Sequence, residues 1–76
     1  MKNERVKRER FIKIAENRTN KIIDMIKLLG NCSNKNNYIY SESDVKQIFN
    51  AIDEELRLTK ARFNEAQSDK KEFKLK

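Results

Sequence analysis

Two long stretches of the chain space their apolar and small residues alternately three and four positions apart, as packed helices do. Proline is absent and Gly30 is the only glycine, so nothing interrupts a helix within either stretch. The sequence therefore predicts an all-α chain with helices over about residues 4–29 and 42–67. The two seams consist of Ile12, Ala15, Thr19, Ile22, Ile26 and Leu29, and of Val45, Phe49, Ile52, Leu56, Thr59, Phe63 and Ala66.

The two seams match layer by layer when the helices are folded antiparallel. Leu29 then lies opposite Val45 at the turn. Ile12 lies opposite Phe63 at the other end, with four layers between in the same register. We therefore expect an antiparallel, coiled-coil-like two-helix hairpin over residues 1–67.

The residues between the two stretches carry helix stop and start signals. Gly30 stands where a left-handed helix stop would lie, and a connection over residues 30–41 is expected. Ser41 and Asp44 have the spacing of a capping box. Tyr40 and Val45 have the spacing of a hydrophobic staple across that cap.

The predicted core ends near Phe11 and Phe63, because the next layers outward contain arginine and lysine. Residues 68–76 are therefore expected to form a basic flexible tail. The alternative is that Phe73 and Leu75 dock on a partner.

A chain of 76 residues with 39% charged and 37% hydrophobic residues is too small and too polar to bury a large core alone. Its single cysteine, Cys32, excludes an intrachain disulfide, and the absence of histidine argues against a Cys/His metal site. We therefore expect the core to be completed by a partner chain.

The same composition argues against an enzyme. There is no histidine for a general base and no Gly-rich phosphate loop. The chain opens without the apolar run of a signal peptide, and its most apolar stretch, residues 22–29, is too short for a membrane span. We expect a cytoplasmic protein without metal or cofactor.

The first helix has more apolar residues than one seam needs, and the surplus is expected to bind a protein partner. Broadening of the hairpin's own core is the alternative. Arg18 borders this surplus and either pairs with Glu55 or Asp53 or lies in the interface. The predicted partner-binding residues of this helix are Phe11, Ile14, Met25 and Leu28.

Tyr38 and Tyr40 form a second apolar surplus in the connection, around Ile39. Alternation places both tyrosines on one side. They are expected either to cover the closed end of the hairpin or to contact a partner.

The net charge of +6 is concentrated at the chain ends. Residues 1–13 carry a net +4, residues 57–76 carry a net +4, and residues 14–56 carry a net −2. An antiparallel hairpin would bring both basic segments to one end, as expected for a protein that binds a polyanion.

Nucleic acid is the polyanion expected to bind this end, through its backbone and with weak sequence specificity. Solubilising tails and an acidic membrane surface are the alternatives. The predicted contact residues are Lys2, Arg5, Lys7, Arg8, Arg10, Arg62, Lys70 and Lys71.

The chain also resembles a known family. The resemblance lies in residues 8–11, 18–21, 29–34, 38–40, 44–45 and 48–52, and it covers roughly residues 5–63. In these segments the chain is similar to the small middle proteins encoded beside the A-family DNA polymerase of staphylococcal cassette chromosomes. The resemblance implies a binding subunit that attaches to the polymerase and helps it hold single-stranded DNA, and it assigns a role to no residue.

Together these features predict a non-enzymatic accessory subunit of a mobile-element DNA polymerase or other replication protein. The alternative is a homodimeric four-helix bundle with a regulatory or scaffold role and no contact with nucleic acid, and a third interpretation is an antitoxin- or inhibitor-like protein that blocks a host factor.

Overall fold

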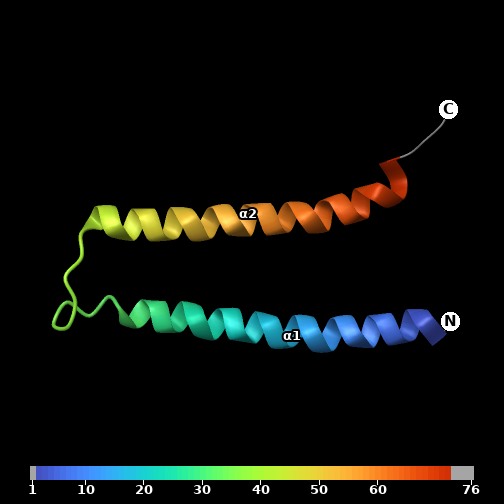
Figure 1. The fold of residues 1–76 in the computed structure, drawn as a ribbon, viewed down its shortest axis with the longest axis horizontal. Coiled ribbons are helices and arrows are strands. Elements are labelled where there is room, and N and C mark those ends of the chain that lie inside the picture. Colours follow the sequence, from blue (N-terminus) through green and yellow to red (C-terminus); the bar gives the residue numbers. More distant parts are fainter. Residues whose placement is uncertain (1, 73–76) are drawn as a thin grey trace. The chain divides into compact units, whose positions relative to one another are not determined.

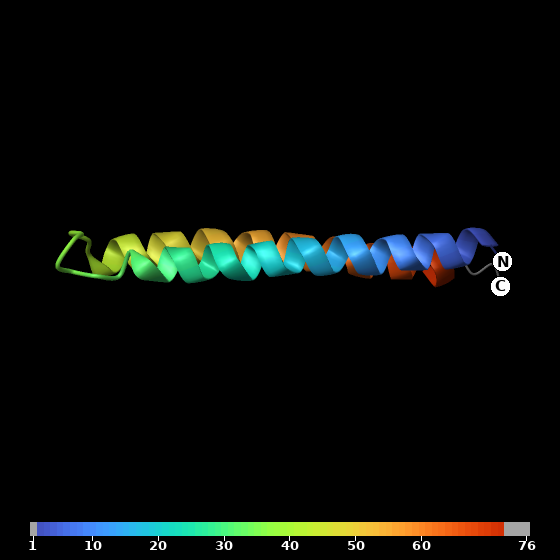
Figure 2. The ribbon, with the colours of Figure 1, turned by 90° about the horizontal axis from the view of Figure 1, so that it is seen from below.

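The computed structural model describes the backbone of residues 2–72 and the side chains of residues 3–67. Two α-helices, α1 (Lys2–Asn31) and α2 (Glu42–Glu72), make up this part of the chain, and it contains no strand (Figure 1). Each helix is continuous in Figure 1, and Figure 2 shows the uninterrupted ribbon of α1 from a second side. The prediction of an all-α chain with two long helices is therefore confirmed.

The chain divides into two units, Met1–Ile39 and Tyr40–Lys76, each built on one helix. Neither unit contains a buried side chain among the described residues, and most of the large apolar side chains are exposed. Both helices therefore display apolar surface that folding within their own unit does not cover.

The expected left-handed stop at Gly30 is wrong. Helix α1 continues through Gly30 to Asn31, and Gly30 does not have a positive φ. The helix closes instead with short-range turns. The amide of Cys32 donates to the carbonyl of Leu29 at 2.9 Å, and the amide of Ser33 donates to the carbonyl of Gly30 at 3.1 Å. These bonds satisfy carbonyls at the helix end without a left-handed residue.

Asn34 organises the connection that follows. Its side-chain Oδ1 accepts a hydrogen bond from the amide of Asn36 at 2.9 Å, which is an Asx turn. Its carbonyl also accepts from the amides of Asn37 at 3.1 Å and Tyr38 at 3.0 Å. The asparagine-rich segment is thus a hydrogen-bonded turn, because Asn34 accepts bonds through both its backbone carbonyl and its side chain.

The capping box at the start of α2 is confirmed. The amide of Ser41 donates to Asp44 Oδ2 at 2.9 Å, and the amide of Asp44 donates to Ser41 Oγ at 3.1 Å. The first helical bond follows, from the amide of Val45 to the carbonyl of Ser41 at 3.2 Å. The staple of Tyr40 on Val45 stays a prediction; Tyr40 is half-buried and Val45 is exposed.

Helix α2 continues to Glu72, five residues past the predicted end at residue 67. Residues 68–72 contain neither glycine nor proline, so the backbone meets no helix-breaking residue there. The remaining residues of the predicted tail, 73–76, lie outside the described residues. Phe73 and Leu75, the two tail residues expected to dock, are among them.

Candidate nucleic-acid and partner interfaces

Five of the predicted phosphate-contacting residues lie in the first three turns of α1, and the side chains of four of them are described. These side chains are exposed, and they belong to Arg5, Lys7, Arg8 and Arg10. Because successive residues of a helix turn by about 100°, the four side chains leave the helix in different directions. The N-terminal end of α1 adds the positive end of the helix dipole to their field. This arrangement suits attraction to a polyanion from several sides better than reading of base edges along one face.

The Arg8 guanidinium lies over the ring of Phe11, 5.8 Å from the ring centroid. At this distance the cation is attracted to the negative face of the ring, an interaction worth about 0.5–1 kcal/mol at an exposed site. Arg8 belongs to the basic set and Phe11 to the apolar set. The contact therefore joins the two predicted surfaces on neighbouring turns of α1.

The basic residues of α2 differ in their surroundings. Arg62 is exposed, and its contact with phosphate stays a prediction. The side chains of Lys70 and Lys71, and that of Lys2 in α1, lie outside the described residues.

Arg57 is engaged within its own helix. Its Nη2 donates to Glu54 Oε2 at 2.6 Å and its Nε donates to Oε1 at 3.1 Å, which forms a bidentate ion pair. The hydrogen bonds from the guanidinium lower the pKa of the Glu54 carboxyl, and those to the carboxylate raise the pKa of Arg57. Sequence reasoning counted Arg57 only as part of the basic segment; the three-residue spacing of Glu54 and Arg57 was the signal for this pair.

The predicted partner-binding residues of α1 are all exposed in the chain by itself. Their side chains retain between 39% and 63% of their accessible surface. Positions 11, 14, 25 and 28 share one side of the helix because 14 and 25 are three turns apart, and 11 and 28 extend the row at either end. We call this surface the α1 flank: Phe11, Ile14, Met25 and Leu28, with Arg18 and Lys21 in its middle.

The tyrosines of the connection do not behave alike. Tyr38 is exposed, whereas Tyr40, next to the cap of α2, is half-buried. Ile39 between them is fully exposed, at 102%. Sequence analysis left Ile39 out of the partner-binding set, although it is the most exposed large apolar side chain described. Its place between the two tyrosines was the signal that its side chain lies on the side opposite to theirs.

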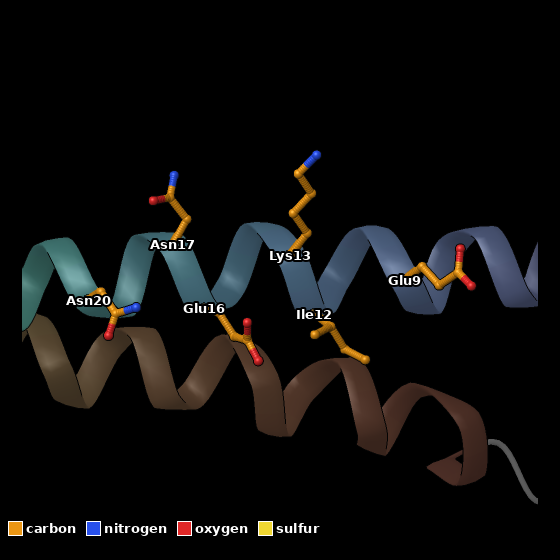
Figure 3. A pocket seen from close by; sticks show the side chains of 6 residues that line it. All are labelled: Glu9, Ile12, Lys13, Glu16, Asn17 and Asn20. Carbon is orange, nitrogen blue, oxygen red and sulfur yellow. The ribbon is translucent and has the colours of Figure 1, made fainter.

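A surface hollow of about 420 Å³ lies along α1 and is lined by residues of this helix alone (Figure 3). Lys13 and Asn17 point to one side of the helix, whereas Ile12 and Glu16 point to another. The side chains therefore do not converge on a common point, and the hollow lacks the arrangement of a binding pocket. Glu9 and Asn20 complete its lining.

No protein-family model, curated protein or solved structure matches the chain. Neither described helix is long and apolar enough to cross a membrane. Among the described side chains, those of residues 3–67, no three histidine, cysteine or acidic groups gather into a site that could hold a metal ion. The thiol of Cys32 is exposed in the turn after α1.

Proposed function

We propose that this protein is a non-enzymatic accessory subunit of a DNA replication enzyme, a mobile-element polymerase being the first candidate. In this role it binds a protein partner through the α1 flank and contributes contacts to nucleic-acid backbone, preferably single-stranded DNA. The observation that carries the proposal is the contact between Arg8 and Phe11, which places an exposed cationic surface beside an exposed apolar one. The role in replication rests on the family resemblance.

The nucleic-acid contact is supported by the charge of residues 1–13, a net +4 carried on a helix. Cations that neutralise phosphates release condensed counterions, and this release gives affinity without sequence information. Backbone binding also requires no particular side chain to meet a base edge. The scattered directions of Arg5, Lys7, Arg8 and Arg10 fit this mode of binding.

The second part of the proposal is that α1 and α2 pair as an antiparallel hairpin. The matching registers of the two apolar seams support it, because burying both seams against each other removes the apolar surface that each helix exposes alone. In this pairing Arg62 lies near the basic start of α1, whereas Lys46 lies at the opposite end, near the turn. The nucleic-acid surface would then include residues from both helices.

Binding of a fluorescent oligothymidine to the purified full chain tests the proposal. We expect Arg62→Gln to weaken binding several-fold and Lys46→Gln, which removes the same charge at the other end, to leave it within about twofold. The combined variant of Arg5, Lys7, Arg8 and Arg10, each changed to Gln, should abolish binding. Unchanged binding in the combined variant would contradict the nucleic-acid role and favour the homodimeric scaffold or regulator; equal effects of Arg62→Gln and Lys46→Gln would contradict the hairpin.

A further inference from the structure

The α1 flank has a symmetrical pattern along the helix. Its residues alternate three and four positions apart, with two apolar residues at each end and two cations in the middle. The pairs Phe11 with Leu28 and Ile14 with Met25 share one midpoint, between residues 19 and 20. Arg18 and Lys21 are centred on the same point. Read in either direction, the flank therefore presents the same order of apolar and basic positions.

Such a pattern is self-complementary in an antiparallel pair of identical helices. In a two-fold symmetric interface, if residue i of one copy contacts residue j of the other, then residue j of the first copy contacts residue i of the second. With the axis between residues 19 and 20, Phe11 of each copy meets Leu28 of the other. Ile14 meets Met25 in the same way, so all four apolar side chains of each flank are covered.

We propose that the occupant of the α1 flank is the α1 flank of a second copy of this chain, packed antiparallel. This inference rests on the proposed function, because it names the protein partner that covers the α1 flank. The replication enzyme would then contact the dimer elsewhere, at the other exposed residue predicted to bind a partner, Tyr38 in the connection. The surface to be covered is present in the structure: Met25 is 63% exposed, and Leu28 is 57% exposed. The dimer would present two nucleic-acid surfaces to one replication enzyme.

The distribution of charge selects the antiparallel over the parallel arrangement. Residues 1–13 carry a net +4, and a parallel pair would hold two such segments side by side. In the antiparallel pair they lie at opposite ends of the shared helix interface, roughly 35 Å apart at 1.5 Å per residue. This distance is several times the Debye length of about 8–10 Å in physiological salt, so their repulsion is screened.

The middle of the interface places Arg18 of each copy against Lys21 of the other. Like charges at a packed position reduce stability, and they also fix the register, because any shifted pairing would bury a cation against an apolar layer. Both side chains have long aliphatic stems that can extend their charges to water.

Cysteine cross-linking of the full chain tests the proposal, in a background in which Cys32→Ser removes the native thiol. Phe11→Cys alone and Leu28→Cys alone should give almost no covalent dimer. In the antiparallel pair each new thiol lies about 25 Å from its own copy in the partner, far beyond the reach of a disulfide. An equal mixture of the two variants should give at least tenfold more covalent dimer, made of one chain of each kind.

The matched control is a mixture of Lys13→Cys and Lys27→Cys chains. These positions lie level with each other in the proposed pair but face away from the flank, so they should not cross-link above background. Light scattering on the unmodified chain provides the second measurement, with an expected mass of twice 9.1 kDa. Cross-linking of Phe11→Cys to itself would overturn the antiparallel arrangement. A monomeric mass without mixed cross-links would overturn the second copy as occupant and assign the flank to a different protein.

These outcomes are separable from the failure of the proposed function. Oligothymidine binding that persists in a chain shown to be monomeric would remove the dimer and leave the nucleic-acid role standing. A dimer that cross-links as expected and does not bind oligothymidine would do the reverse.

Discussion

Ser41 and Asp44 cap α2 reciprocally, each backbone amide donating to the side chain of the other residue, at 2.9 and 3.1 Å. We expect Ser41→Ala to cost about 1 kcal/mol of helix stability, because it leaves the Asp44 amide without its acceptor at the helix start. Circular dichroism during thermal unfolding measures the effect. Ser43→Ala is the matched control, because the Ser43 hydroxyl accepts a hydrogen bond from the Gln47 side chain and none of the backbone bonds of the cap. Loss of this hydroxyl should change the midpoint of thermal unfolding little. Equal effects of the two substitutions would contradict the cap.

Gly30 is a helical residue, and its replacement distinguishes this finding from a left-handed stop. A Cβ added at Gly30 meets no atom within 4 Å, and the residue has no positive φ. We therefore expect Gly30→Ala to stabilise α1 by about 0.5–1 kcal/mol, because alanine loses less backbone entropy in a helix. Urea unfolding followed by circular dichroism measures it. A stop in the left-handed region would give the opposite sign, a loss of stability.

The pair of Glu54 and Arg57 makes a prediction about pH. The guanidinium lowers the pKa of the Glu54 carboxyl from its usual 4.5. A carboxyl whose pKa is depressed in the folded helix contributes stability above the unfolded value and loses it as the pH falls through the folded value. Titration of Glu54 by NMR should therefore give a midpoint below 4.5, and Arg57→Gln should return it upward. Lys60→Gln is the control with the same loss of charge; if it moves the midpoint as far as Arg57→Gln does, the shift is general electrostatics and not this pair.

Sequence reasoning predicted correctly the features that two neighbouring side chains determine, and less well those that depend on the structure around them. The cap of Ser41 and Asp44 was predictable because a capping box depends on two side chains three residues apart. The end of α1 was misplaced because the fate of Gly30 depends on the bonds made by the residues after it, and Cys32 and Ser33 form short turns that remove the need for a left-handed residue.

The candidate site was predictable in composition and less so in detail. The exposure of Phe11 and Met25 followed from a surplus of apolar residues that one seam does not use. Two contacts depend on side-chain rotamers, which residue counts do not contain: that of Arg8 with Phe11 and that of Arg57 with Glu54. Charge totals therefore located the two basic segments. They also counted Arg57 of the segment 57–76 as available to a ligand, although it is paired with Glu54.

The nucleic-acid role of this protein depends on neutralisation of phosphates by the basic start of α1. The most direct test measures the affinity of the full chain for a fluorescent oligothymidine by anisotropy at a series of salt concentrations. For a handful of phosphate contacts we expect a linear fall of log affinity with log salt, with a slope of about −3 to −5. The variant with Arg5, Lys7, Arg8 and Arg10 changed to Gln should show no measurable binding. An affinity that does not change with salt would contradict this role.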